Sequence, residues 1–423
     1  MNTSTFAKTI VSHWSVIAVV AVLIYYSIFS HEFQLYWDDQ WQVINSMTND
    51  GISLKNLQTI FHSQYSPINQ LYYTLIHLCF GYSSLAFHIG NLLFHIFNAC
   101  LVYLLAYSFI RNHFDSKKAL GISFFTALLF AIHPVQVETV CWISASKIVL
   151  STFFYLSALI CYIQYMRNSK WQYLLASGVS SILAMGCKEQ SVIIVPCLLL
   201  FDWMLFKRNM RSLKVYIEKV YYLIPAIAIF IVTLVANKNT GEEIIGYTIV
   251  DRFIFLCYSS FKYLLISAIP FKLSYLYPFP FQVGEKIPMA LWIYPFVILF
   301  IGYVIYLNRR KPLLVFCTLF FILHLLPVLH VIPLPRYVVA ADRYLYIPYI
   351  AFAIGLSILS YHLYERQRKW ILYAGFLYCS YLCVYTAGYA PAWKNSDTLK
   401  EHFKEVLKKR ETNLSINFKH EKQ

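Results

Sequence analysis

The sequence predicts an all-α, polytopic membrane protein built as a bundle of transmembrane helices. Of its 423 residues, 59% are hydrophobic, 18% are aromatic and only 13% are charged. A soluble domain cannot bury that apolar fraction, so the chain is expected to lie in a bilayer. Its apolar runs are roughly 17–22 residues long and do not alternate with polar residues, which favours helices over the strands of a barrel.

The positions of the basic residues predict how the chain threads the membrane. The net charge of +15 needs no nucleic-acid partner, because Lys and Arg concentrate between the apolar segments, as the positive-inside rule expects. Lys8 places the N-terminus inside, before a first, uncleaved span near residues 10–29. Residues 30–84 then form a large first outer loop. Further spans are expected at about 85–110, 119–132, 171–186, 219–236, 289–307, 312–330, 344–362 and 370–388. Two more are expected between these, one ending near Arg167 and one ending near Lys207.

The segment 252–270 is a weaker candidate, because it carries Arg252, Lys262 and three serines, and we interpret it as interfacial or re-entrant. The later basic runs 309–311 and 366–369 then both fall on the inner side. The total is eleven spans with the C-terminus outside, and twelve is the alternative. Residues 1–392 form this membrane domain. Residues 393–423 form a short tail with apolar residues at helical spacing, which predicts one amphipathic helix.

This topology brings charged residues that are distant in sequence to one face of the membrane. Charges close to spans are costly and usually face a polar cavity, so their convergence predicts an active site on the outer face. The residues placed there are Asp38, Asp39, His133, Glu138, Lys188, Glu189, Arg336, Asp342 and Arg343.

The acidic pair in Tyr36-Trp37-Asp38-Asp39 is the predicted catalytic centre. Adjacent carboxylates repel, so they persist where chemistry needs them or where water screens them. A carboxylate can act as general base on an acceptor hydroxyl that attacks the anomeric carbon of a sugar. We expect Asp38 to be this base and Asp39 to orient the acceptor or assist the base. A solvated, helix-capping turn is the alternative.

The basic residues of the outer face are predicted to bind a phosphate. Lys188 and Arg343 are the expected ligands, with Arg336 and His133 nearby. They would stabilise the negative charge on a departing lipid phosphate. The alternatives are a surface ion pair for Lys188 and a snorkelling side chain in an aromatic belt for Arg343. The expected supporting residues around them are Glu138, Glu189, His88, Asn91, His95, Asp342 and Tyr344.

A polar stripe on the second span faces the bundle interior, because His88, Asn91, His95 and Asn98 are spaced by 3, 4 and 3 residues. Interhelical hydrogen bonding is favoured over metal binding for this stripe. A divalent metal near Asp38, Asp39 and Glu138 is an open alternative, and no metal ligand is predicted. The ten cysteines show neither disulfide nor zinc spacing.

The sequence contains no Gly-rich phosphate loop, dinucleotide fingerprint or Walker motif. No soluble domain is predicted that would hold a nucleotide sugar. An enzyme of this class is therefore expected to take its activated group from a lipid carrier in the membrane.

Seven motifs occur in a specific order over nearly the whole chain. They are Asp38-Asp39, Tyr65-Ser66-Pro67, Phe87-His88-Ile89-Gly90-Asn91 with His95, His133-Pro134-Val135-Gln136-Val137-Glu138-Thr139-Val140, Lys188-Glu189, Ala341-Asp342-Arg343-Tyr344-Leu345-Tyr346-Ile347-Pro348 and Trp393-Lys394-Asn395-Ser396-Asp397-Thr398-Leu399. In this order they resemble the membrane glycosyltransferases of the GT-C fold. Within that fold the chain is similar to the transmembrane and tetratricopeptide-repeat-containing O-mannosyltransferases and their bacterial relatives.

The resemblance implies a polyprenyl- or dolichyl-phosphate-linked sugar as donor and inverting transfer to an acceptor hydroxyl, with a carboxylate of the acidic pair as base. Two departures stand out. Gln136 replaces the second His of the family's His-Pro-(Ile/Val)-His motif, and Ser144-Ala145-Ser146-Lys147 replaces a Gly-Arg-Ala-Asp-type run. The repeat domain is absent, and the tail at 393–423 has the length of roughly one helical repeat.

The acceptor is expected to be a protein hydroxyl, a lipid headgroup or a surface polysaccharide, and the family resemblance favours protein O-mannosylation. A lipid-linked sugar transporter or flippase is the main alternative, although the ionisable residues collect at one surface rather than at the midplane. A non-catalytic scaffold is the third hypothesis. The short loops favour a bacterial inner membrane over the endoplasmic reticulum.

Overall fold

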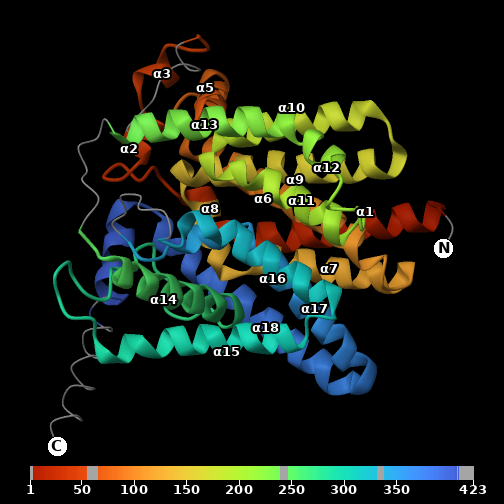
Figure 1. Ribbon diagram of the computed structural model, residues 1–423. Coiled ribbons are helices and arrows are strands. Elements are labelled where there is room, and N and C mark those ends of the chain that lie inside the picture. Colours follow the sequence, from red (N-terminus) through yellow and green to blue (C-terminus); the bar gives the residue numbers. More distant parts are fainter. Residues whose placement is uncertain (1–2, 55–64, 239–245, 331–337, 407, 409–423) are drawn as a thin grey trace, which may run out of the picture.

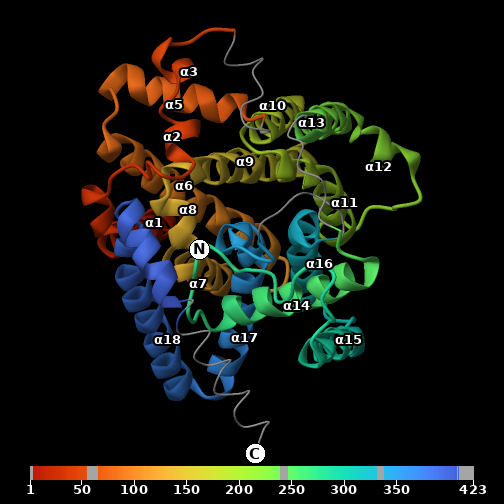
Figure 2. The ribbon, with the colours of Figure 1, turned by 90° about the vertical axis from the view of Figure 1, so that its left-hand side faces the viewer.

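The protein is described here from a computed structural model, which places residues 3–54, 65–238, 246–330, 338–406 and 408. Throughout this part the regular structure is helical, and the only β pairing there is an isolated bridge between Tyr277 and Ala340. Many of the long helices run in a similar direction: α10 (Trp171–Cys187), α13 (Val220–Lys238) and α15 (Ile293–Leu307) lie lengthwise in Figure 1 and are seen nearly end-on in Figure 2. The all-α prediction is therefore confirmed.

The long helices follow the predicted spans in chain order. Each predicted span falls on a helix of the described chain: α1 (Thr3–Ile24), α6 (Ser84–Ile110), α7 (Ser116–Ile132), α9 (Ser146–Asn168), α10 (Trp171–Cys187), α11 (Ile194–Met204), α13 (Val220–Lys238), α15 (Ile293–Leu307), α16 (Pro312–Leu325), α17 (Pro348–Arg366) and α18 (Arg368–Tyr389). Length and hydropathy alone qualify five helices of the described residues as spans, or six if α7 and α8 (Val137–Cys141), bent by 51°, form one. The counts of eleven and twelve remain predictions.

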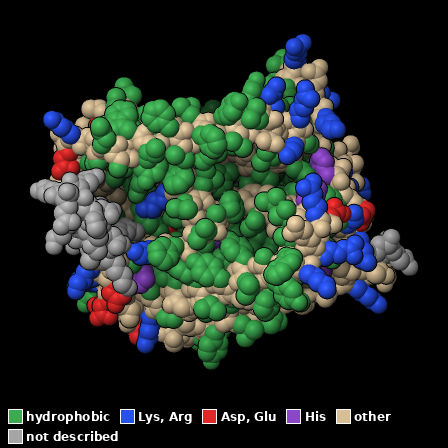
Figure 3. Space-filling view, turned by 90° about the horizontal axis from the view of Figure 1, so that it is seen from below, with side chains coloured by type: hydrophobic (Ala, Val, Ile, Leu, Met, Phe, Trp, Pro, Cys, Tyr) green, Lys and Arg blue, Asp and Glu red, His purple; other side chains and the backbone are tan. Residues whose placement is uncertain are grey.

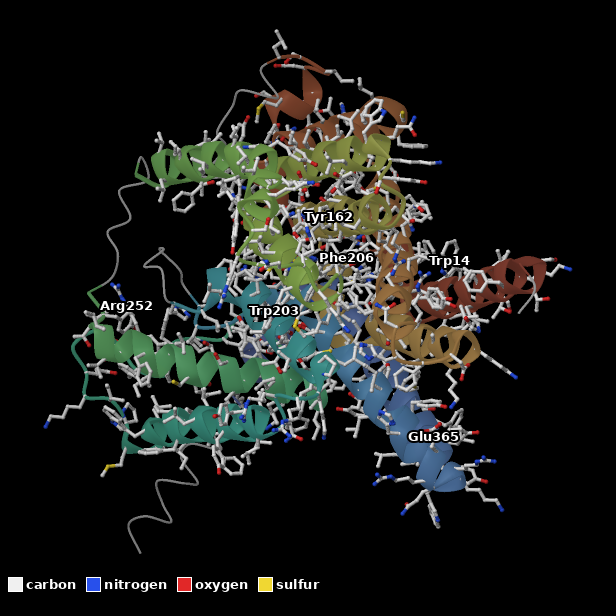
Figure 4. All side chains as sticks on the ribbon, turned by 45° about the vertical axis from the view of Figure 1, so that its right-hand side comes forward. Trp14, Tyr162, Trp203, Phe206, Arg252 and Glu365 are labelled. Carbon is white, nitrogen blue, oxygen red and sulfur yellow. The ribbon has the colours of Figure 1, made fainter. Side chains whose placement is uncertain are left out.

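The predicted inner loops gather at one end of the bundle. Lys118 Nζ lies 3.1 Å from Glu365 Oε1, which joins the first turn of α7 to the last turn of α17. The guanidinium of Arg167 donates to the carbonyl of Ser108 at 3.0 Å. Lys and Arg side chains gather toward this end, on the right of Figure 3, while apolar side chains cover the middle. Figure 4 places Glu365 at this end and Arg252 at the other.

A buried ionic cluster joins α9, α11 and the segment before α13 at the predicted inner end of the bundle. Lys219 Nζ lies 2.7 Å from Asp202 Oδ2 and donates to Tyr162 Oη at 2.7 Å, and Tyr162 in turn donates to Asp202 Oδ1 at 2.6 Å. Arg208 adds a bond to Glu218 and a longer one to Asp202. The opposite charges compensate one another, so the cluster fastens α9 and α11 to the segment before α13.

The predicted first outer loop contains helices in its described part, residues 30–54 and 65–84, and the sequence patterns did not predict them. It holds α2 (Asp39–Gln42), α3 (Ser46–Asn49) and α5 (Pro67–Phe80), which form the upper left part of Figure 1. Helix α5 packs directly on α10 at Gly186, where a Cβ atom would come within 2.6 Å of Ile68. A glycine at that position allows the outer loop to sit close to the bundle.

The predicted re-entrant segment contains α14 (Ile249–Ala268) and the extended residues after it. The Tyr378 hydroxyl donates to the carbonyl of Ala268, level with the middle of α18, and the Tyr385 hydroxyl accepts from the amide of Leu273 one to two turns further out. The residues that follow α14 therefore run alongside α18, and the interfacial or re-entrant interpretation of residues 252–270 stays a prediction.

The segment after α18 folds onto the first outer loop. It consists of η8 (Ala390–Trp393) and helical residues 396–406. The Trp393 carbonyl accepts from Gln34 Nε2 at 2.8 Å, and the Lys394 carbonyl accepts from the Glu32 amide at 2.8 Å. Helical residues at 396–406 agree with the predicted amphipathic helix, and residues 409–423 lie outside the described part of the chain.

Candidate active site

The acidic pair rests on a short turn at residues 143–147, where η3 (Ile143–Ala145) leads into α9. Asp39 is fully buried, and its Oδ1 accepts hydrogen bonds from the Ser144 amide at 2.8 Å and the Ser144 hydroxyl at 2.5 Å. Its Oδ2 accepts from the Gln34 amide at 2.8 Å. Both carboxylate oxygens of Asp39 are thus engaged within the protein, so this residue anchors the first outer loop to the 143–147 turn.

We expect the Asp39 anchor to be sensitive to pH. Burial raises the pKa of Asp39 to about 6, against the opposing effect of its hydrogen bonds from Ser144 and Gln34. The folded protein therefore holds this proton more tightly than the unfolded chain. The stabilisation is fully present below the ordinary pKa of 3.8 and is lost as pH rises to about 6.

Thermal unfolding of the wild type and of Asp39→Asn between pH 4 and pH 7 tests this anchor. As pH rises, the free energy of unfolding of the wild type should fall relative to that of Asp39→Asn by up to about 3 kcal/mol. A difference that is the same at every pH would show that Asp39 does not titrate in this range.

Asp38 has a different environment from its neighbour. Its side chain is half-buried, and its Oδ2 accepts a hydrogen bond from Gln42 Nε2 at 3.2 Å. The Oε1 atom of the same Gln42 accepts from Lys147 Nζ at 3.0 Å. The structure therefore separates the pair: Asp39 is sequestered, and Asp38 is oriented by one amide while part of it stays accessible.

Arg343 is fixed by a buried carboxylate. Glu138 is fully buried on α8, and its Oε1 lies 2.5 Å from Arg343 Nη1 while its Oε2 accepts from the Arg343 amide at 2.8 Å. The guanidinium also lies over the rings of Trp142 and Tyr344, at 5.7 and 5.1 Å from their centroids. Its remaining N–H groups are held in a defined direction, as a phosphate ligand requires.

Asp342 points the other way, into the bundle. Its Oδ1 accepts from the Tyr277 hydroxyl at 2.7 Å, and Lys262 Nζ lies 3.8 Å from the centre of the Tyr277 ring. Burial, together with the nearby Glu138 carboxylate, raises the pKa of Asp342 well above its usual value. Through its hydrogen bond with Tyr277, Asp342 supports the η7 turn (Asp342–Leu345) that carries Arg343.

The remaining predicted cation lies on the same end of the bundle. Lys188 Nζ is 3.5 Å from Glu189 Oε1, and the Lys188 side chain is only 12% exposed. Lys147 lies close enough to Asp38, Lys188, Glu189 and Arg343 to interact with all of them electrostatically. Residues from four separate stretches of the sequence therefore lie at the same end of the bundle.

The polar stripe of α6 joins helices to one another, as predicted. His88, Asn91, His95 and Asn98 are all at most 1% exposed. Asn91 Nδ2 donates to the carbonyls of Val140 and Trp142, which holds the chain on either side of Cys141. His95 Nε2 lies 3.1 Å from the Ala131 carbonyl, so that nitrogen carries the proton and Nδ1 accepts from Tyr346 Oη at 2.8 Å.

Loss of the Tyr346 hydroxyl should weaken this network. Tyr346 is buried, donates to His95 and accepts from Asn98 Nδ2 at 3.2 Å, so Tyr346→Phe removes the partner of His95 Nδ1 and leaves Asn98 Nδ2 with only the Val149 carbonyl. We expect a loss of about 1–3 kcal/mol, measured as a lower unfolding temperature in detergent. Tyr373→Phe, at an exposed position on α18, is the matched control and should change little. Equal effects of both variants would rule out a stabilising network.

The sequence and fold of the chain have recognisable relatives. Residues 65–236 match the family model described as dolichyl-phosphate-mannose-protein mannosyltransferase. The human protein O-mannosyl-transferase TMTC2 is 28% identical over 182 residues, which cover 41% of this chain and 19% of that protein. The Drosophila melanogaster protein O-mannosyl-transferase Tmtc1 is 26% identical over 35% of this chain and 16% of its own length.

Among solved structures, the archaeal oligosaccharyltransferase AglB from Archaeoglobus fulgidus superimposes with a TM-score of 0.50. The superposition covers 90% of this chain and 56% of that one at 14% identity, so it speaks for the fold. The chain resembles a GT-C membrane glycosyltransferase. It spans about a fifth of the length of the curated O-mannosyltransferases that it matches, so their activity is not carried over as a whole.

The two other residues predicted near the phosphate, His133 and Arg336, are not placed at the site. His133 is fully buried, and its Nδ1 accepts from the Val135 amide at 3.2 Å while its ring lies 4.2 Å from that of Tyr349. It caps the turn η2 (Pro134–Gln136) at the junction of α7 and α8, so its visible role is structural. Arg336 lies outside the described residues.

The carboxylates of Asp38, Asp39 and Glu138 are not arranged to bind the divalent metal considered from the sequence. The carboxylates of Asp39 and Glu138 are turned toward Ser144, Gln34 and Arg343, which leaves Asp38 as the accessible acid of that trio. In the part of the chain with described coordinates, no three His, Cys, Asp or Glu side chains gather as metal ligands. No catalytic step is therefore assigned to a metal.

Three residues of this site were not singled out from the sequence: Gln34, Gln42 and Trp142. Trp142 stacks against Trp393 at 5.8 Å and so links the 143–147 turn to the segment after α18. Trp37, beside the acidic pair, meets Tyr275 of the returning segment edge-on at 5.0 Å. A tryptophan lies in or beside each of these polar motifs, and this could have indicated the contacts from the sequence, because large aromatic rings often fill the contacts between segments.

Proposed function

We propose that the protein is an inverting glycosyltransferase that moves a sugar from a polyprenyl-phosphate carrier to an acceptor hydroxyl at the outer face of the membrane. The observation that carries the proposal is that Asp38, Lys188 and Arg343, far apart in the sequence, all lie within electrostatic range of Lys147 at one end of the bundle. An accessible carboxylate and two cations at the same end form the charge arrangement that such a reaction needs: a base for the hydroxyl and a positive site for the departing phosphate.

In the proposed reaction the acceptor hydroxyl lies against Asp38. The carboxylate takes the hydroxyl proton as the acceptor oxygen bonds to the anomeric carbon. The bond from that carbon to the phosphate oxygen breaks, and the electron pair leaves with the polyprenyl phosphate. Arg343, held by Glu138, and Lys188 stabilise the additional negative charge on the phosphate. Because a single displacement occurs, the configuration at the anomeric carbon is inverted.

The lipid carrier is supported by the nature of the fold and of the relatives. The matching family model describes dolichyl-phosphate-mannose as donor, and the solved AglB structure is described in complex with a dolichol-phosphate and an inhibitory peptide. These descriptions favour mannose as the sugar and a protein hydroxyl as the acceptor. A lipid headgroup or a surface polysaccharide remains the alternative acceptor. A bacterial inner membrane remains our predicted location, although the relatives named above are animal proteins.

The experiment that tests this proposal is sugar transfer by the purified protein in lipid nanodiscs. Polyprenyl-phosphate mannose and polyprenyl-phosphate glucose, each with a radioactive sugar, are offered with acceptor peptides rich in Ser and Thr and with a membrane lipid extract. Time-dependent movement of label from one carrier to an acceptor supports the proposal. Movement of labelled lipid across sealed vesicles without a new glycosidic bond would instead support the flippase hypothesis.

A further inference from the structure

In the 143–147 turn, Ser144-Ala145-Ser146-Lys147 replaces the family's Gly-Arg-Ala-Asp-type run, so that Lys147 occupies the position of the acidic residue. Lys147 is 8% exposed at the first turn of α9, where an ammonium group is costly unless it serves a defined contact. Its Nζ donates to Gln42 Oε1 at 3.0 Å, and Gln42 Nε2 donates to Asp38 Oδ2 at 3.2 Å. A single side-chain amide therefore connects a buried cation to the proposed base.

The whole turn is held from the outer-loop side. Ser144 donates twice to Asp39, as described above. Ser146 Oγ donates to Tyr73 Oη at 2.9 Å, and the Tyr73 hydroxyl donates to the Ile143 carbonyl at 3.2 Å. These bonds join the turn to α2 and α5, so the position of Lys147 relative to α2 is set on both sides. The Lys147 ammonium donates to the single side-chain oxygen of Gln42, and this orients the amide so that its NH₂ group faces Asp38.

We infer that Lys147 is a positioning residue for the proposed transfer reaction, acting through Gln42 to hold the Asp38 carboxylate in the orientation that accepts the acceptor's proton. The inference rests on the proposed function for its chemistry, and on the hydrogen bonds of Gln42 for its geometry. In this chain a cation and an amide together hold the base in place.

The first test compares steady-state transfer by Lys147→Met, Gln42→Leu and the double variant. A loosened base lowers kcat, by roughly 10- to 100-fold since a displacement of about 1 Å can cost that much, and leaves the donor KM unchanged. Because Lys147 acts through Gln42, the double variant should be no worse than the poorer single variant. Lys147→Arg keeps the positive charge and should recover part of kcat. Lys170→Met is the matched control, because Lys170 is exposed in the turn between α9 and α10.

The opposite results are equally specific. A raised donor KM with kcat unchanged, or losses that multiply in the double variant, would make Lys147 a direct ligand of the donor phosphate and overturn the inference. Wild-type kinetics in both single variants would also overturn it.

A second measurement does not depend on activity and separates the two proposals. Hydrogen exchange of the amides at residues 38–45 should rise severalfold in Lys147→Met and in Gln42→Leu, with exchange in α10 unchanged. If the wild type transfers no sugar from any polyprenyl-phosphate donor, the proposed function fails while this measurement still decides whether Lys147 holds α2. Unchanged exchange in both variants would show that it does not.

Discussion

Asp38→Asn should lose about 10²- to 10⁴-fold in kcat for sugar transfer, with little change in donor KM, because the amide keeps the shape of the side chain and removes the base. Asp38 is half-buried and accepts its hydrogen bond from Gln42 Nε2, so the substitution leaves the surrounding packing in place. The measurement is single-turnover transfer in nanodiscs, with equal insertion and unfolding temperature confirmed for both proteins.

The neighbouring acid supplies the control for this prediction. Asp39→Asn disturbs the buried anchor on Ser144, so it should lower the unfolding temperature as well as the rate. If Asp38→Asn turns over like the wild type while a folded Asp39→Asn is inactive, the assignment of the base to Asp38 is wrong.

The second large effect is expected at the ion pair of Arg343. Glu138→Gln leaves a buried guanidinium beside a neutral amide, and breaking a buried pair of this kind costs about 3–5 kcal/mol. The Glu138 side chain is fully buried and the Arg343 side chain is 22% exposed, so water compensates little of that loss. We expect a much lower unfolding temperature in detergent and, in the protein that remains folded, a higher donor KM.

Glu365→Gln is the matched control for this ion pair. It breaks the contact with Lys118 at the inner end, where both side chains are 45% exposed, and surface pairs of this kind contribute little. A stability loss at Glu138 no larger than the loss at Glu365 would show that the Arg343 pair is not structurally important, and the account of a fixed phosphate ligand would lose its support.

The general fold and the location of the site could be predicted from the sequence because both depend on simple periodicities. The long apolar runs determine helices, and the basic loops between them determine which charges share an end. Asp38 and Arg343, more than 300 positions apart in the chain, could therefore be placed together by counting crossings. The same argument predicts that residues 252–270 are interfacial or re-entrant, because Lys262 and the serines interrupt the apolar run, and this stays a prediction.

The roles within the site could not be predicted, because they depend on contacts between segments. Asp38 and Asp39 are equivalent in sequence, and only their contacts distinguish an oriented, accessible acid from a buried anchor. Lys147 was noticed as a departure from a family pattern, but its bond to Gln42 joins two segments separated by about a hundred residues. His133 has the residue type of a phosphate ligand, yet it caps a turn inside the bundle.

The central claim is that Asp38 acts as a base in a single displacement at the outer end of the bundle. The most direct measurement is the anomeric configuration of the sugar in the purified product, determined by nuclear magnetic resonance and compared with that of the polyprenyl-phosphate donor. The account predicts inversion. Retention of configuration would require a covalent or second displacement at the site and would contradict the role assigned to Asp38.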